Sequence, residues 1–186
     1  MTPLKIGACL KAEEIAPHRD WLFDSARDIE LQDFVSHAGL SSAYEDRIAA
    51  AISALDGHTG RRGIHGPYEG LDMDNKDAEL QPLITARFIK ALEAAERVGA
   101  RQVVLHSPYN AWFHNNRLAR PDYAETLLET IHTIMDPVVR DAEARGVTLV
   151  IENIVDVDPA HRRLMMESFG SDAIALSIDT GHAQIA

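Results

Sequence analysis

The sequence has 186 residues, 46% of them apolar, so it can bury one sizeable core, and disorder is not expected. Its 29 acidic and 18 basic residues give a formal net charge of -11, which disfavours nucleic-acid binding. The sequence contains neither a signal-peptide-like stretch nor an apolar run long enough to span a membrane. A single cysteine, Cys9, excludes an internal disulfide and is interpreted as a small core residue. We therefore expect a cytoplasmic protein with one domain over residues 1–186.

Short apolar runs alternate along the chain with longer stretches of helical periodicity. This alternation is typical of successive βα units that build a parallel sheet. The runs predicted as strands are 5–9, 28–31, 63–65, 102–106, 148–152 and 175–179.

The first two long connections are predicted as amphipathic helices. One begins with a capping box formed by Ser42 and Glu45 and ends at Gly57. The other ends at Gly99, where a left-handed C-cap costs little. The apolar positions expected to pack on the sheet are Ile48, Ala51, Ile52 and Leu55 in the first helix, and Leu80, Leu83, Ile84, Ala91, Leu92, Ala95 and Val98 in the second.

The next connection is predicted to be helical from near Pro121 to Gly146. Pro137 interrupts this pattern, so either the helix kinks there or Asp136 caps a second helix. The last connection, 159–169, is predicted to be a short helix.

Two architectures accept six successive βα units: an open doubly wound sheet and a closed (β/α)8 TIM barrel. No glycine-rich phosphate loop follows the first strand. Potential ligands end several strands, and a barrel turns the ends of many strands toward one centre. We therefore predict a TIM barrel truncated to about six of its eight units. If this truncation is natural, the open sheet edges would favour pairing with another chain, and a homo-oligomer is then expected.

Four strand-like runs end in a side chain that can bind a metal: His65, His106, Glu152 and Asp179. A single histidine in this position is more often a hydrogen-bonded interior residue. A carboxylate after an apolar run such as TLVI, however, is costly unless a cation matches it. Asp179 and His182 are three residues apart at a strand end, where both can approach one ion. Together these residues predict a divalent-metal site, and the donors suit Zn, Mn, Co or Fe without identifying one.

Aromatic side chains follow the third and fourth strands. Tyr68, Tyr109 and Trp112 could line a pocket for a small polar ligand, or they could simply pack within their loops. Glu30, at the end of the second strand, is interpreted as half of an ion pair in preference to a pocket acid. The histidines interpreted as surface or loop residues are His18, His37, His58, His114, His132 and His161.

The phrases IHGPY, VGARQVVLHSPY, VTLVIENI and LSIDTGHA resemble the xylose isomerase-like TIM barrel superfamily, especially its sugar phosphate isomerase/epimerase group and more distantly endonuclease IV. The resemblance implies that Glu152 and Asp179 bind a divalent metal (Mn, Co, Mg or Zn) and that His182 contacts substrate or metal. It also implies that His65 and His106 line the site, as metal ligands or as pocket residues. Further family ligands, a histidine and a second glutamate, come from later strands that this sequence does not include.

This resemblance leads to three functional hypotheses. The first is an isomerase or epimerase that acts on a small sugar or sugar-derived ketone through an enediolate, with Glu152 and His182 as catalytic residues. The second is an endonuclease IV-like zinc phosphodiesterase, which the net charge and the DTGH phrase, in place of the nuclease's DTCH, disfavour. The third is an inactive truncated barrel that serves as a binding or assembly module.

Overall fold

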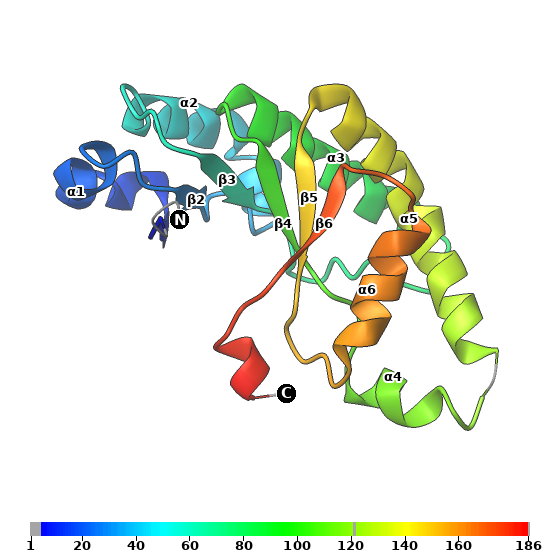
Figure 1. The fold of residues 1–186 in the computed structure, drawn as a ribbon. Helices are drawn as coiled ribbons and strands as arrows, with labels where there is room; N and C mark the ends of the chain where they lie inside the picture. The colour runs from blue at the N-terminus through cyan, green and yellow to red at the C-terminus, as the bar shows by residue number, and fades with distance from the viewer. Residues whose placement is uncertain (1–4, 121, 186) are drawn as a thin grey trace.

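The computed structural model describes residues 5–120 and 122–185. It contains one sheet of six strands, all parallel, in the order β1-β2-β3-β4-β5-β6 (Figure 1). The strands are β1 (Ala8–Leu10), β2 (Ile29–Leu31), β3 (Arg62–His65), β4 (Gln102–His106), β5 (Thr148–Glu152) and β6 (Ile174–Ser177). Since every strand pairs with its neighbour in sequence and the order never reverses, this is the strand order of a barrel rather than of a doubly wound sheet.

The helices are α1 (Arg19–Phe23), α2 (Tyr44–Ala54), α3 (Gln81–Arg97), α4 (Ala111–Asn116), α5 (Tyr123–Arg145) and α6 (Pro159–Ser168). Helices α2, α3 and α5 lie along one face of the sheet, and α3 packs beside α5 (Figure 1). Short 3-10 turns cover Ala12–Glu14, Ala16–His18, Ala38–Leu40 and His182–Gln184. Within the described residues, no helix combines the length and the apolar character needed to cross a membrane.

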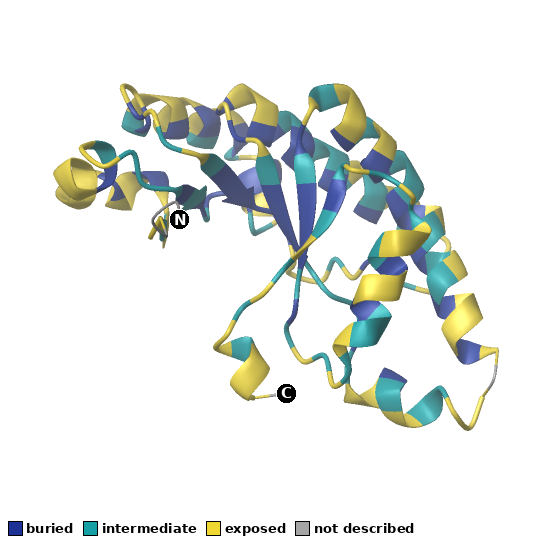
Figure 2. Cartoon of the chain, viewed as in Figure 1, coloured by how far each residue is buried: buried dark blue, intermediate teal, exposed yellow. Residues whose placement is uncertain are grey.

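Along each strand, successive side chains alternate between the two faces of the sheet. The strands of the sheet are coloured mostly as buried (Figure 2). In β4, Val103 and Leu105 are each 1% exposed and belong to the hydrophobic core. His106, one residue further, therefore points to the opposite face, which would be the interior of a barrel. In β5, Leu149 and Ile151 are likewise buried in the core, so Glu152 shares the face of His106. Strand alternation thus gathers the polar strand ends on one side of the sheet.

Helix boundaries differ from the sequence prediction in two places. The capping box is wrong, because α2 begins after Ala43 with no side-chain cap, and the Glu45 carboxylate instead binds Arg97 of α3. The second-helix alternative at Pro137 is also wrong, since α5 runs through Pro137 as one helix. The Thr85 hydroxyl donates to the Ile134 carbonyl at 2.9 Å, so α3 supplies a hydrogen bond to α5 in the turn before the proline.

Other helix predictions have mixed outcomes. Pro121, the predicted start of the long helix, lies outside the described residues. Gly99 has the expected left-handed backbone, with φ of 71°, and Gly146, the predicted stop of the long helix, is its C-cap with φ of 62°. Ile52 and Leu83 are 50% and 49% exposed, so the two predicted core stripes are narrower than the apolar pattern indicated.

Cys9 is not the core residue that the sequence predicted. It is exposed on β1, on the face opposite the helices, where its Sγ lies 2.6 Å from Nε2 of Gln32 and 3.5 Å from Oε1 of Glu30. Glu30 accepts a second hydrogen bond from Gln32 and makes no ion pair among the described residues, so its predicted ion pair is wrong as well. Both errors have one cause: alternation along these short strands turns Cys9 and Glu30 away from the helices.

Candidate metal centre

His65 is held at the end of β3 by the backbone that follows it. Its Nδ1 lies 2.8 Å from the carbonyl oxygen of Gly66, which leaves Nε2 to face the neighbouring strands. Gly66 is required here, because an added Cβ would lie 2.6 Å from Cδ2 of Leu105 and 2.9 Å from the Val104 carbonyl oxygen. Its N–H donates to that same carbonyl at 2.8 Å. The close contact between β3 and β4 therefore fixes the position of the His65 ring.

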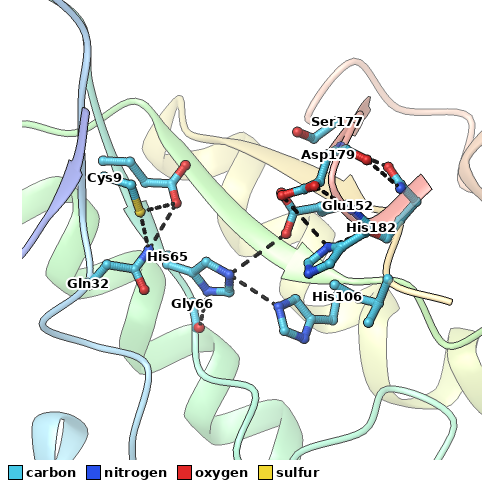
Figure 3. A network of polar contacts seen from close by, with 12 residues as sticks. Cys9, Gln32, His65, Gly66, His106, Glu152, Ser177, Asp179 and His182 are labelled. Carbon is cyan, nitrogen blue, oxygen red and sulfur yellow. Dashed lines mark hydrogen bonds and ion pairs between the residues drawn. The ribbon is translucent and has the colours of Figure 1, made fainter. Parts of the chain in front are cut away.

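His65, His106 and Glu152 converge from three adjacent strands (Figure 3). Nε2 of His65 lies 3.2 Å from Nε2 of His106 and 4.0 Å from Oε2 of Glu152. The register places His106 directly opposite Glu152 in the β4–β5 pair. Strand ends predicted from the sequence to meet are therefore brought together.

The electrostatics of this group keep His106 in the neutral form that can bind a metal. Loss of hydration, reinforced by the nearby His65 and His182, lowers the pKa of His106 to about 4, so its imidazole is neutral at pH 7. Loss of hydration also raises the pKa of Glu152, helped by the negative charges of Asp179 and Glu30 and opposed by His65. A partly buried carboxylate with a raised pKa is a group that a cation would stabilise and that can also exchange a proton.

Asp179 and His182 form a second group beyond the end of β6. The Asp179 Oδ1 accepts the backbone N–H of His182 at 2.7 Å, and this bond is the main reason that the pKa of Asp179 is lowered. Nδ1 of His182 lies 3.8 Å from Oδ2 of Asp179 and 3.0 Å from the Asn153 carbonyl oxygen. The strand itself ends at Ser177, earlier than predicted, so Asp179 lies on the turn rather than in the sheet.

Asn153 fixes this turn to β5 and was not identified from the sequence. Its side chain is buried; it donates to the Asp179 carbonyl and accepts from the Asp179 N–H, each at 2.9 Å. The side-chain amide of Asn153 therefore pairs with the backbone of Asp179 as the backbone of a residue on a neighbouring strand would. The signal was present as the asparagine that follows Glu152 in the phrase IENI, but nothing in the sequence paired it with Asp179.

Glu152 belongs to both groups. The ligand atoms of His65, His106 and Glu152 lie within 4.8 Å of one another, and so do those of Glu152, Asp179 and His182 (Figure 3). Imidazoles and carboxylates without thiolates suit Zn, Mn, Co or Fe. The residues present therefore fit a divalent cation, with Glu152 and Asp179 as carboxylate ligands and His65, His106 or His182 as imidazole ligands.

The three aromatic residues predicted to line a pocket behave differently. Tyr68 stacks on His106 with ring centroids 4.6 Å apart and meets His65 edge-on. Tyr109 is 7% exposed and packs on Phe113, yet it also lines a concave pocket beside His106. Trp112 is 70% exposed on α4, so the structure does not bring it to the group of histidines.

The pocket beside His106 has a volume of about 360 Å³, within the range of small-ligand sites. Its walls come from the loops after β3, β4 and β5, and they include Asp72 and Asp74, which the sequence analysis did not single out. Burial, together with the charge of Asp72, raises the pKa of Asp74. The acidic loop after IHGPY was the available signal for these two residues.

Parallel βα units with imidazoles and carboxylates at the C-terminal ends of the strands define the class as a TIM-barrel-type α/β protein with a candidate metal centre. The family model described as xylose isomerase-like TIM barrel matches residues 25–186. The chain belongs to this family, which confirms the predicted fold class and the resemblance. No curated protein matches the sequence significantly.

Solved structures share the fold at low sequence identity. The TTHB071 protein from Thermus thermophilus, soaked with ZnCl2, is 20% identical with a TM-score of 0.69, over 97% of this chain and 68% of that one. The 3-keto-D-glucoside 4-epimerase YcjR from E. coli is 14% identical with a TM-score of 0.72, over 98% and 71%. A D-tagatose 3-epimerase-like protein is 19% identical with a TM-score of 0.66, over 84% and 57%. The chain thus spans 57% to 71% of these structures' lengths.

Proposed function

We propose that the protein is a metal-dependent isomerase or epimerase of a small sugar or sugar-derived ketone. The observation that carries the proposal is the position of Glu152, which lies within reach of His65 on one side and of Asp179 and His182 on the other. Two of the structural neighbours are named for sugar epimerisation, a 3-keto-D-glucoside 4-epimerase and a D-tagatose 3-epimerase-like protein. A carbohydrate is therefore the substrate class that we assign to the pocket beside His106.

The proposed chemistry is proton transfer at a carbon next to a carbonyl group. A divalent cation bound at Glu152 and Asp179 would polarise the adjacent carbonyl and hydroxyl oxygens and stabilise the enediolate. Glu152, whose carboxylate reaches both groups of ligands, removes or returns the proton. His182, held by its backbone N–H on Asp179, binds a substrate hydroxyl. Tyr109 forms a wall of the ketose pocket, and Tyr68, stacked on His106, lines a separate, smaller hollow that also reaches His106.

Solvent exchange tests this proposal without knowledge of the product. The chain is incubated with Mn²⁺ or Co²⁺ in D2O with D-tagatose, D-fructose and a 3-keto-glucoside, and deuterium incorporation is followed by NMR. We expect exchange at the carbon adjacent to the carbonyl, reduced on the order of 100-fold or more in Glu152→Gln. The matched control is Glu13→Gln, an exposed glutamate on an N-terminal 3-10 turn. Metal-loaded protein without exchange into any ketose would contradict the proposal.

A second candidate function rests on the group formed by His65, His106 and Glu152. Two imidazoles and a carboxylate on adjacent strands would also suit a zinc phosphodiesterase of the endonuclease IV type. The formal net charge of -11 opposes DNA binding, so this function ranks second. Nicking of a duplex containing an abasic site by the zinc-loaded chain, abolished in His106→Gln, would move it to first place.

A further inference from the structure

A second group of metal-ligating side chains lies outside the candidate centre. His114 on α4, Asp158 at the N-cap of α6 and His161 in the first turn of α6 offer ligand atoms that all lie within 4.8 Å of one another. They share no residue with the groups around Glu152. Both histidines are interpreted from the sequence as surface or loop residues, because nothing in the sequence brings residue 114 next to residue 161.

The two histidines present nitrogens that are hidden from water and unused by the protein. Nδ1 of His114 and Nε2 of His161 are buried and have no hydrogen-bond partner among the described residues. A buried ring nitrogen without a partner costs free energy, so it points to a ligand that supplies one. These two atoms belong to different elements that approach each other only in the folded chain, and a local turn motif therefore does not account for them.

Asp158 completes the donor set without losing its structural role. Its Oδ1 caps α6 by accepting the Ala160 N–H at 2.9 Å, whereas Oδ2 faces Nε2 of His161 at 3.8 Å. The carboxylate therefore contributes one oxygen to the helix and leaves the other for a ligand. A distance of 3.8 Å is long for a direct hydrogen bond and about 0.5 Å longer than the roughly 3.3 Å between two ligands of a tetrahedral zinc ion, so a bound ion would draw the two side chains slightly together.

Neighbouring aromatic rings hold His161 in position. Phe113 meets the imidazole edge-on with centroids 4.9 Å apart, and Tyr109 lies at 5.8 Å. Burial lowers the pKa of His161, with Asp158 opposing that shift, so the imidazole is neutral at pH 7. A neutral, oriented imidazole is the form that binds a transition metal.

We propose that His114, Asp158 and His161 form a second metal site, which binds a zinc-class divalent transition ion and clasps α4 to the start of α6. Two imidazoles and one carboxylate leave a fourth position for water, and the absence of hard all-oxygen donors disfavours Mg²⁺ and Ca²⁺. The clasp joins the connections that follow β4 and β5. Since Tyr109 lies in one of them, bound metal would also stiffen a wall of the pocket beside His106.

One nearby charge opposes cation binding. The Arg117 guanidinium donates to the His114 carbonyl oxygen, and its positive charge acts on both His161 and Asp158. Arg117→Gln should therefore bind Zn²⁺ more tightly than the parent, by a few-fold, because the repulsion is removed while the three ligands remain. Weaker binding in this variant would count against the proposal.

Equilibrium dialysis with Zn²⁺ tests the site directly. Introduced singly into the parent chain, His161→Gln and His114→Gln should each reduce bound zinc by about one ion per chain. The control His18→Gln, which changes an exposed histidine of an N-terminal turn, should leave the bound zinc unchanged. Combining His65→Gln, Glu152→Gln and Asp179→Asn removes ligands from both groups of the main centre. That combined variant should retain about one zinc ion. Adding His161→Gln to it should weaken the binding of this remaining ion by at least about 10-fold.

The zinc content of the single variants either supports or overturns the second metal site. Equal zinc content in the parent, His161→Gln and His114→Gln overturns the second site even if the combined variant fails to fold. Loss of one ion in both single variants supports it independently of any activity at Glu152. Hydrogen exchange supplies a separate readout: Zn²⁺ should slow exchange in residues 111–116 and 159–162 of the parent but not of His161→Gln. The same protection in both proteins would contradict the clasp.

Discussion

His106 carries the largest electrostatic cost in the candidate centre. Its pKa is lowered to about 4 by loss of hydration and by the neighbouring His65 and His182, whereas an unfolded histidine titrates near 6.5. Between these values the unfolded chain binds a proton that the folded chain does not. Stability is therefore full above about pH 6.5 and falls as the pH drops toward 4.

Urea unfolding of the metal-free chain in EDTA measures this dependence. Between pH 7 and 5, we expect His106 alone to lower the free energy of unfolding by about 1 kcal/mol, after allowance for its partial exposure. His106→Asn should lose that part of the pH dependence, whereas His37→Asn, at an exposed position, should keep it. Parallel pH profiles for the parent and His106→Asn would show that the histidine is not desolvated as described.

Cys9 is exposed but should be chemically quiet. Loss of hydration of its sulfur, followed by the charge and hydrogen bond of Glu30, raises its pKa to about 12. Because the thiolate is the reactive form, iodoacetamide at pH 8 should alkylate Cys9 at least about 100-fold more slowly than a model thiol. Glu30→Gln should accelerate the reaction, and mass spectrometry follows both rates. Alkylation of the parent at the model rate would contradict this assignment.

At the scale of elements, Arg162 connects the parts that carry the site. This residue of α6 is 5% exposed; its guanidinium donates to the carbonyls of Ile151 and Ser177, and its Nε lies 3.3 Å from Oδ1 of Asp156. Asp156 in turn accepts a hydrogen bond from the Ser107 hydroxyl at 2.8 Å. One buried ion pair thus joins α6, the ends of β5 and β6, and the loop after β4.

Breaking that ion pair should be costly. Arg162→Ala leaves the Asp156 carboxylate buried without its cation, and we expect it to lower the free energy of unfolding by about 3–5 kcal/mol. The matched control is Arg163→Ala, one residue along, where an exposed i,i+4 pair with Glu167 contributes only about 0.5 kcal/mol. Chemical denaturation compares the two. Similar losses in both variants would mean that the Arg162 network does not hold these elements together.

Sequence patterns predicted the strand ends well because alternation and apolar runs are local properties. The runs ending in His65, His106 and Glu152 became β3, β4 and β5 with those residues at their ends. The capping box failed because Glu45 finds a stronger partner in Arg97, which lies 52 residues away in sequence. Asn153, Arg162 and the His114–His161 pair escaped notice for the same reason, since each gains its partner only through tertiary packing.

For the whole molecule, the fold explains why dispersed residues meet. Six parallel strands in sequential order carry their C-terminal ends to one edge, and every residue of the candidate centre lies at or just after such an end. The helices cover the opposite face of the strands, so the polar side of the sheet stays available to an ion and a ligand (Figure 2). Family membership and the solved structural neighbours agree with the TIM-barrel fold that brings these strand ends to one edge.

We propose that Glu152 and Asp179 hold a divalent cation at this edge. Titration with Mn²⁺, followed by the electron paramagnetic resonance signal of the free ion, measures it most directly, since Mn²⁺ prefers carboxylates to the histidine-rich second site. We predict about one bound Mn²⁺ per parent chain, the same in His161→Gln, and at least about 10-fold weaker binding in Glu152→Gln and Asp179→Asn. Equal Mn²⁺ binding by the parent and both carboxylate variants, or none by the parent, would contradict the metal centre.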